Sequence, residues 1–238
     1  MKKKTILITG GAKRIGAAIT KYFATKNCNI FINYLHSEKE AIELERFVKA
    51  AGSVAIPYKA DVTNNDEVAT LFEFANKEFG GFDILINNAG VFPSKKTLDE
   101  LKYTDYIDTL NLNMNSALIT TKEFIKNKTK VRDRRIINIS SVGGINIFKN
   151  HIDYNLSKAG LIRLTQILAK ELAPNTSINC ICPGIVQIEN EEINFPLEKI
   201  PMQRFATTDD IIAGIDFFAN CPSYITGQVL NISGGMEL

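Results

Sequence analysis

The chain has 238 residues, with 28 Lys and Arg against 26 Asp and Glu and a formal net charge of +2. This near-balance excludes a global electrostatic attraction to nucleic acid or to acidic membranes, so we expect neither as a partner. No run of about 18 apolar residues occurs, so no membrane-spanning segment is expected. The length fits a single α/β domain that spans residues 1–238.

The cysteine and histidine content argues against disulfide and metal chemistry. The sequence has no Cys-x-x-Cys pair and only two histidines, so we expect reduced thiols and no metal site. The apolar stretch at residues 5–9, behind a basic start, is too short for the core of a signal peptide. A cytoplasmic protein is therefore expected. The cysteines are Cys28, Cys180, Cys182 and Cys221.

Apolar, β-branched runs alternate with helical patterns along the chain. Strands are predicted at residues 5–9, 29–34, 53–59, 82–87, 135–139, 177–181 and 229–232. Helices are predicted at residues 14–26, 37–51, 64–79 and 154–173, the third with Asn64 or Asn65 as its N-cap. Continuous apolar strands separated by helices indicate a doubly wound, Rossmann-type parallel sheet with helices on both faces.

One stretch, residues 185–205, lacks clear periodicity and is dense in Glu, Asn and Pro. Long irregular segments in compact domains are usually lids or binding loops. We therefore expect residues 185–205 to form a substrate-binding flap within the domain.

The sequence Thr9-Gly10-Gly11-Ala12-Lys13-Arg14-Ile15-Gly16 follows the first predicted strand and opens the first helix. A glycine-rich turn at this place lets the backbone approach a pyrophosphate and directs the helix N-terminus at it. The spacing is not that of the G-x-G-x-x-G fingerprint, so the prediction depends on the position of the turn after the first strand. We expect this turn to bind a dinucleotide through Gly10, Lys13, Arg14, Ile15 and Gly16.

The end of the second predicted strand favours a phosphorylated cofactor. Sites for NAD usually place an acid about 20 residues after the glycine turn, to bind the ribose 2′-hydroxyl. This chain instead reads Tyr34-Leu35-His36-Ser37, and its first acid here is Glu38. Lys13 and Arg14 bring positive charge, and Arg14, His36 and Ser37 are suitable partners for a 2′-phosphate. The expected cofactor is NADPH or NADP.

Tyr154 and Lys158 are four residues apart in a predicted helix, so they share one face, one turn apart. A phenol has a pKa of about 10 and is protonated at pH 7. A nearby ammonium stabilises the phenolate and makes the phenol a better acid. Any helix can carry Tyr-x-x-x-Lys by chance, so the pair indicates acid catalysis only in combination with other motifs.

Five motifs occur in order on the expected elements: Thr9-Gly10-x-x-x-Arg14-x-Gly16, Asn87-Asn88-Ala89-Gly90, Ser141, Tyr154-x-x-x-Lys158 and Pro183-Gly184. This combination resembles the short-chain dehydrogenase/reductase family over essentially the whole chain. The resemblance implies seven parallel strands in the order 3-2-1-4-5-6-7 and an NADP-dependent oxidoreductase. It also implies a homotetramer built on the helices around residues 113–126 and 154–173.

The resemblance implies a role for each catalytic motif. Tyr154 matches the family's general acid, and Lys158 matches the lysine that binds the nicotinamide ribose and lowers the pKa of the tyrosine. Ser141 matches the serine that orients and polarises the reacting group. The proton-relay asparagine has three candidates, of which the spacing to Ser141 favours Asn113; the others are Asn111 and Asn115.

Further motifs match the family's cofactor contacts. Asn88, Ala89 and Gly90 resemble the segment along the adenosine side, and Asp61-Val62 resembles the pair that holds the adenine. Pro183-Gly184-Ile185-Val186 resembles the edge beside the nicotinamide. The chain departs from many members in having Gln187 and Ile188 where they place a threonine. We therefore expect backbone groups around Val186 to bind the nicotinamide amide.

Two subgroups of the family compete for the substrate. Arg14, the segment 34–37 and the missing threonine are similar to the pteridine reductases, and Phe92 falls where those enzymes stack the pterin. Ser141 is instead typical of ketone reduction, as in the 3-oxoacyl-acyl-carrier-protein reductases, which the C-terminal segment also resembles.

A reductase that acts on an acidic carrier protein needs a basic surface. The chain has a basic run before the fifth predicted strand, at the end of the sheet opposite the expected site, so we interpret it as a solvated face. The run comprises Lys126, Lys128, Lys130, Arg132, Arg134 and Arg135. The sequence thus favours a pteridine (dihydropteridine or dihydrofolate-type) reductase over a 3-oxoacyl-carrier or other ketone or aldehyde reductase. A non-catalytic NADP-sensing regulator is a third alternative, disfavoured because all four catalytic positions are filled.

Overall fold

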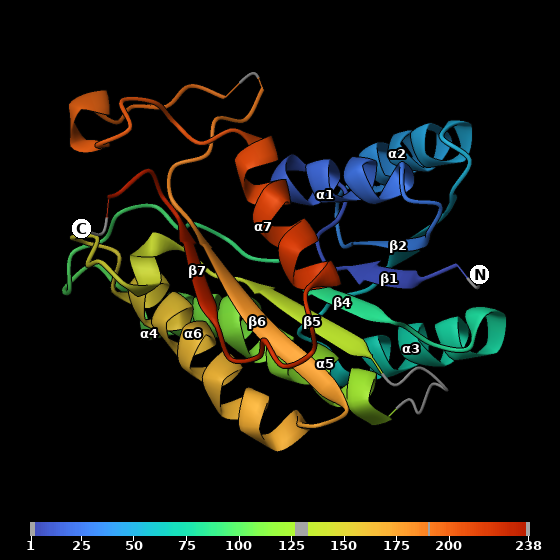
Figure 1. Cartoon of the computed structure of the whole chain (residues 1–238). Coiled ribbons are helices and arrows are strands. Elements are labelled where there is room, and N and C mark those ends of the chain that lie inside the picture. The colour runs from blue at the N-terminus through green and yellow to red at the C-terminus, as the bar shows by residue number, and fades with distance from the viewer. Residues whose placement is uncertain (1–2, 127–132, 190, 237–238) are drawn as a thin grey trace.

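The computed structural model describes residues 3–126, 133–189 and 191–236. Its centre is one parallel sheet in the order β3-β2-β1-β4-β5-β6-β7, which confirms the predicted topology (Figure 1). The strands are β1 (Thr5–Ile8), β2 (Asn29–Tyr34), β3 (Val54–Lys59), β4 (Ile84–Asn87), β5 (Arg134–Ile139), β6 (Thr176–Pro183) and β7 (Val229–Ile232).

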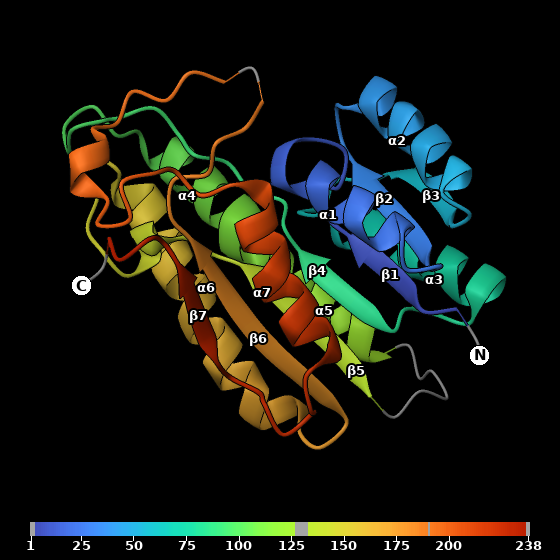
Figure 2. The same ribbon diagram turned by 45° about the horizontal axis from the view of Figure 1, so that its top comes forward.

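Helices cover both faces of this sheet (Figures 1 and 2). One face carries α1 (Arg14–Ala24), α2 (Glu38–Ala50) and α7 (Thr208–Asn220). The other carries α3 (Asn65–Phe79), α5 (Ser116–Lys126) and α6 (Ile152–Leu172). A short helix, α4 (Tyr103–Leu110), packs against α6 and continues into α5 through a π-helical turn, Asn111–Asn115. Single 3₁₀ turns occur at Val142–Gly144 and Leu197–Lys199.

The alternation of side chains along each strand produces two apolar cores. Successive residues of a strand point to opposite faces. Ile6 and Ile8 therefore enter the core under α1, α2 and α7, whereas Leu7 enters the core under α3, α5 and α6. In the second core the ring of Phe31 lies edge-on to Phe82, with 4.9 Å between the ring centroids. Both faces of the central strands are thus buried, which is why these strands read as continuous apolar runs.

Hydrogen-bonded caps define the starts of two helices. Asn64 is the N-cap of α3, as predicted, and its side-chain oxygen accepts from the backbone N–H groups of Asp66 at 3.0 Å and Glu67 at 3.3 Å. Thr207 and Asp210 form a reciprocal capping box at the start of α7. Such caps satisfy backbone donors that a helix leaves without partners in its first turn.

The 185–205 segment connects β6 to α7 at the carboxyl ends of the strands. It arches away from the end of β6 before the chain returns to α7 (orange in Figures 1 and 2). Its base is fixed by a bridge between Val186 and Ala206, and the backbone N–H of Gln187 donates to the Ala206 carbonyl at 2.8 Å.

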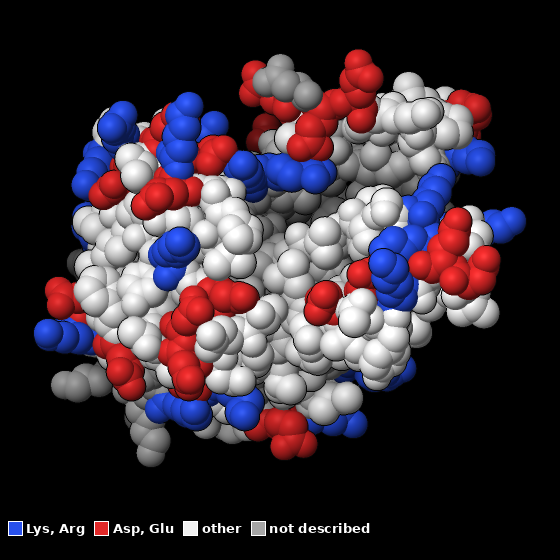
Figure 3. All heavy atoms as spheres, turned by 180° about the vertical axis from the view of Figure 1, so that it is seen from behind, with Lys and Arg blue, Asp and Glu red and all other residues white. Residues whose placement is uncertain are grey.

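Charged side chains of both signs are interspersed on the surface, and they border a hollow on the face shown in Figure 3. Among the helices of the described residues, none is long and apolar enough to cross a membrane.

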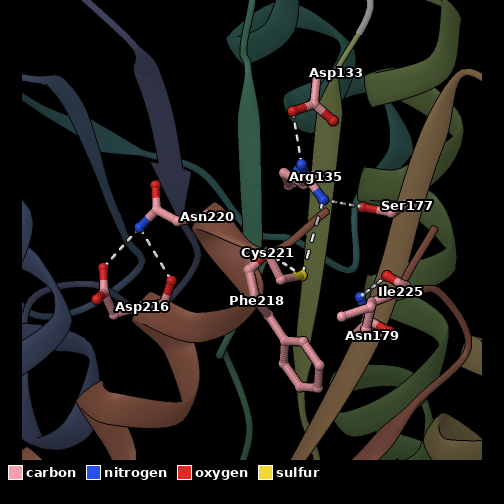
Figure 4. Close-up of polar contacts among 9 residues, drawn as sticks. All are labelled: Asp133, Arg135, Ser177, Asn179, Asp216, Phe218, Asn220, Cys221 and Ile225. Carbon is pink, nitrogen blue, oxygen red and sulfur yellow. Dashed lines mark hydrogen bonds and ion pairs between the residues drawn. The ribbon is translucent and has the colours of Figure 1, made fainter. Parts of the chain in front are cut away.

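Two arginines of the basic run are buried, which corrects our interpretation of that run as a solvated face. Arg135 on β5 donates to the carboxylate of Asp133 at 2.6 Å and to the hydroxyl of Ser177 on β6 at 3.1 Å (Figure 4). The guanidinium of Arg134 lies 3.8 Å from the ring centroid of Phe124 and donates to the carbonyl of the same residue. These arginines join β5 to its neighbours and are not available to a partner. Of the other members, Lys126 is exposed, and Lys128, Lys130 and Arg132 lie outside the described residues.

Candidate active site

The glycine turn after β1 is packed so closely that two of its residues must be glycine. Gly10 has φ +58°, a conformation that L side chains rarely adopt. A Cβ on Gly16 would lie 2.1 Å from the Gly10 carbonyl oxygen. The side-chain amide of Asn88, just after β4, donates to the carbonyls of Thr9 at 2.9 Å and Gly10 at 3.1 Å. The turn is therefore fixed to the end of β4 and leaves its outer side open.

Asn33, near the end of β2, is a structural residue that the sequence analysis did not single out. Its side-chain oxygen accepts from the Gly10 N–H at 3.3 Å, and its backbone carbonyl accepts from the Gly11 N–H at 2.9 Å. Its side-chain amide donates to the Ala60 carbonyl at 2.9 Å. The signal in the sequence was a polar side chain in a buried strand, which must find hydrogen-bond partners.

The start of α1 fits an anion. In the part of the chain that the structure describes, no side chain caps α1 at Lys13, and its first turn has no acidic residue. The first N–H groups of a helix have no partners within the helix, and its N-terminus carries partial positive charge. Together with the glycine cradle, this end of α1 suits the pyrophosphate of a dinucleotide.

The two cations of the turn are both paired with carboxylates. Lys13 Nζ lies 2.9 Å from Glu40 Oε1 on α2, and Arg14 Nη2 lies 3.0 Å from Glu191 Oε2 in the 185–205 segment. The structure thus pairs Arg14 with the 185–205 segment. The contact of Arg14, His36 and Ser37 with a 2′-phosphate stays a prediction. Arg14 itself has φ +51°.

Tyr154, Lys158 and Ser141 meet at the base of the cleft. The phenol of Tyr154 is 8% exposed and shares a hydrogen bond with Ser141, whose hydroxyl oxygen accepts from the Gly143 N–H at 3.0 Å. Burial raises the pKa of Tyr154, and the hydrogen bond to Ser141 and the charge of Arg14 oppose this effect. The phenol is therefore neutral and able to donate a proton.

Lys158 is 6% exposed, and burial lowers its pKa to about 8. Its ammonium donates to the Ile139 carbonyl at 3.1 Å and lies 6.0 Å from the centroid of the Tyr154 ring. The predicted lowering of the Tyr154 pKa by Lys158 is not seen here, because the ammonium is directed at Ile139 and the burial of the phenol dominates.

Asn113 lies in the π-helical turn and is 1% exposed. Its side chain accepts from the Val91 N–H at 2.7 Å and donates to the Val91 carbonyl at 2.9 Å and the Ser157 hydroxyl at 3.1 Å. A Cβ on Gly90 would meet both Asn113 Oδ1, at 2.9 Å, and Lys158 Nζ, at 3.3 Å. Asn113 thus adjoins the lysine, whereas Asn115 donates to Asn111 at 2.8 Å.

A cleft of about 700 Å³ joins the glycine turn to these residues at the carboxyl ends of β1, β4, β5 and β6. The predicted site residues that line it are Gly10, Lys13, Arg14, Ile15, Gly16, Asn88, Ala89, Gly90, Phe92, Ser141, Tyr154, Lys158, Pro183, Gly184 and Val186. The predicted residues that the structure describes outside this lining are Tyr34, His36, Ser37, Asp61, Val62 and Asn113.

Three of the residues predicted for the adenine end have local structural contacts. The Asp61 carboxylate accepts from the Thr63 N–H at 2.8 Å and hydroxyl at 2.7 Å, and Val62 is buried in the second core. The Tyr34 hydroxyl lies 3.4 Å from Glu38 Oε1. The contacts of these residues with a cofactor remain predictions.

Aromatic rings form the wall of the cleft beyond Tyr154. Phe92 is 57% exposed and edge-on to Tyr154, with 4.6 Å between ring centroids. Its other neighbours are His151, stacked at 4.5 Å, and Phe148, at 6.4 Å. Phe148 also lines the cleft and was missed, because it lies outside the motifs we used. Asn155 holds it to α6 by accepting from its N–H at 3.2 Å and donating to its carbonyl at 2.8 Å.

Among the described residues, no group of three or more His, Cys, Asp or Glu side chains is placed to hold a metal ion. The four cysteines are free and buried.

Comparison with known proteins gives the family. The sequence profile of a family described as "Enoyl-(Acyl carrier protein) reductase" matches residues 10–237. A 3-oxoacyl-[acyl-carrier-protein] reductase from Synechocystis sp. is 34% identical over 98% of this chain and 96% of its own length. One from Buchnera aphidicola is also 34% identical, over 99% of this chain and 98% of its own. A short-chain dehydrogenase/reductase from Serratia marcescens has a similar structure, with a TM-score of 0.91, 28% identity and coverage of 99% and 98%. This chain therefore belongs to the short-chain dehydrogenase/reductase family and is an NADP-dependent oxidoreductase.

Proposed function

We propose that this enzyme reduces a ketone with NADPH, and that Tyr154 donates the proton. The observation that carries this proposal is the buried, neutral phenol of Tyr154, which is hydrogen-bonded to Ser141 and lies one helical turn before Lys158 in a cleft that begins at the glycine turn. We place ketone reduction of the 3-oxoacyl class ahead of pteridine reduction, which reverses the preference drawn from the sequence. Ser141 and the relatives named 3-oxoacyl-[acyl-carrier-protein] reductases support this order.

Different parts of the cleft would bind different parts of the cofactor. The glycine turn and the start of α1 would hold the pyrophosphate, the segment Asn88 to Gly90 would lie along the adenosine side, and Pro183 to Val186 would border the nicotinamide. Tyr34, His36, Ser37, Asp61 and Val62 would surround the adenine and its phosphorylated ribose. NADPH supplies the hydride when it is bound.

Side chains of this protein donate the proton and position its acceptor. Tyr154 Oη donates it to the substrate oxygen, and Ser141 orients that oxygen through its hydroxyl, which the Gly143 N–H fixes from behind. Lys158 is charged at pH 7, because its pKa of about 8 lies above that value, and it would bind the nicotinamide ribose. Asn113 holds the backbone segment at Val91 beside Lys158. We propose that the 185–205 segment covers the substrate, and that the enzyme works as a cytoplasmic homotetramer.

The test compares NADPH oxidation with a short 3-oxoacyl thioester and with a dihydropterin. We expect turnover of the thioester, and a Tyr154→Phe variant should lose about 10²–10⁴-fold in kcat while it still binds NADPH. Tyr224→Phe is the matched control, since this tyrosine is 98% exposed and lies outside the cleft lining. Full turnover by Tyr154→Phe would show that Tyr154 is not the acid.

Pteridine reduction is the second candidate, and a specific observation favours it. The exposed ring of Phe92 lies beside Tyr154 in the cleft, where it could stack on a flat heterocycle. Turnover of the dihydropterin without turnover of the thioester would establish this function instead.

A further inference from the structure

The two basic side chains at the start of α1 each form an ion pair with a carboxylate from another part of the chain. Lys13 pairs with Glu40 at 2.9 Å, and Arg14 pairs with Glu191 at 3.0 Å. All four side chains are partly exposed to solvent, and opposite charges lie next to one another along the upper rim in Figure 3. A polyanionic cofactor that enters the cleft therefore meets neutral pairs and must exchange with their carboxylates.

The two pairs lie on different sides of the glycine turn. Glu40 is in the first turn of α2, directly after the 34–37 segment, where a 2′-phosphate is expected. Glu191 lines the main cleft with Arg14, and the charge of Arg14 reaches the phenol of Tyr154. Both cations line the cleft, but Lys13 is paired toward α2, on the expected adenosine side, and Arg14 is paired toward the 185–205 segment, on the expected pyrophosphate and nicotinamide side.

Gln187 holds Glu191 in its place. Its side-chain amide donates to the Glu191 carbonyl at 3.0 Å and to the Ile188 carbonyl at 3.2 Å. The Glu191 N–H donates in turn to the Ile188 carbonyl at 3.1 Å. Gln187 stands where many members of the family place a threonine. In this chain it is a positioning residue, because it holds the turn from which the Glu191 carboxylate reaches Arg14.

We propose that Glu40 and Glu191 are specificity-determining residues that compete with the phosphates of the cofactor for Lys13 and Arg14. Glu40 weakens binding of the 2′-phosphate and so limits the preference for NADPH over NADH. Glu191 weakens binding of the pyrophosphate, which both nucleotides share. This inference rests on the proposed cofactor site.

The test measures dissociation constants of NADPH and NADH by the fluorescence of the bound reduced nicotinamide, without substrate. Glu191→Gln removes one negative charge beside the pyrophosphate and should tighten both nucleotides by about threefold to tenfold at low salt. Glu40→Gln should tighten NADPH by a similar factor and leave NADH unchanged. Glu189→Gln is the matched control, because this exposed glutamate is in the same turn but outside the cleft lining, and it should change neither constant.

A double variant shows whether Glu191 acts through Arg14. Arg14→Gln should weaken both nucleotides, and adding Glu191→Gln to it should have a smaller effect than Glu191→Gln has in the native chain. Unchanged binding by Glu191→Gln would overturn the competition, and weaker binding would in addition indicate that Glu191 helps to retain the cofactor. If the native chain binds neither nucleotide, the proposed cofactor site itself is wrong, and the inference fails with it.

Discussion

Replacing Lys158 by methionine should stabilise the folded protein at neutral pH, although it removes a residue of the proposed active site. Burial lowers the pKa of Lys158 from 10.5 to about 8, and this difference corresponds to about 3 kcal/mol. The folded protein bears none of this cost above pH 10.5, where the amine is neutral in both the folded and unfolded chains. As the pH falls, Lys158 takes up its proton in the unfolded chain before it does so in the folded protein. The free energy of unfolding therefore decreases between pH 10.5 and about 8, and below that range the full cost of the buried charge is present.

Methionine keeps most of the length of the lysine but leaves the Ile139 carbonyl without its donor, which costs about 1–2 kcal/mol. The net expectation at pH 7 is a gain of about 1–2 kcal/mol in the free energy of unfolding. At pH 10 and above the gain should shrink and then reverse, because only the lost hydrogen bond remains.

Urea denaturation of the cofactor-free protein at pH 7 and pH 10 measures this difference. Lys170→Met is the control, since Lys170 is an exposed lysine on the same helix. A difference between Lys158→Met and the native chain that is the same at both pH values would refute the reasoning, because the cost would then not come from the buried charge.

Two further substitutions test the construction of the site. Gly16→Ala places a Cβ 2.1 Å from the Gly10 carbonyl oxygen and should destabilise the fold by about 1–3 kcal/mol and weaken NADPH binding; a native dissociation constant would contradict this. Asn113→Ala leaves the N–H and C=O of Val91 without partners and should cost about 2–3 kcal/mol in unfolding free energy. Asn115→Ala should cost less than half as much, because its partly exposed side chain bonds only Asn111 among the described contacts, and equal losses in denaturation experiments would argue against this role for Asn113.

The sequence predicted the sheet well because burial on both faces makes each central strand a continuous apolar run. All seven strands lie where these runs occur, with ends that differ from the predicted ones by at most two residues. The glycine turn and the Tyr154-x-x-x-Lys158 pair were also found, since each depends on neighbours within one turn of chain.

Contacts between distant segments were beyond the same reasoning. The ion pair between Arg14 and Glu191 joins residues that are far apart in the sequence, so no local pattern predicted it. Arg134 and Arg135 were interpreted as part of a solvated face because their run precedes the fifth strand, opposite the expected site. Contacts with Phe124, Asp133 and Ser177 instead allow both arginines to be buried. Asn33 was overlooked because the hydrogen-bond partners of its side chain come from other turns and strands.

The π-helical turn at Asn111–Asn115 makes the position of Asn113 a matter of helical phase. One extra residue in a helix rotates everything beyond it by about 100°, so α4 and α5 present their apolar faces in directions that one uninterrupted α-helix could not combine. α4 packs on α6, whereas α5 packs on α3. The number of residues in this turn therefore matters as well as their types. Deleting any one of them would rotate α4 or α5 out of its packing or turn Asn113 away from Lys158.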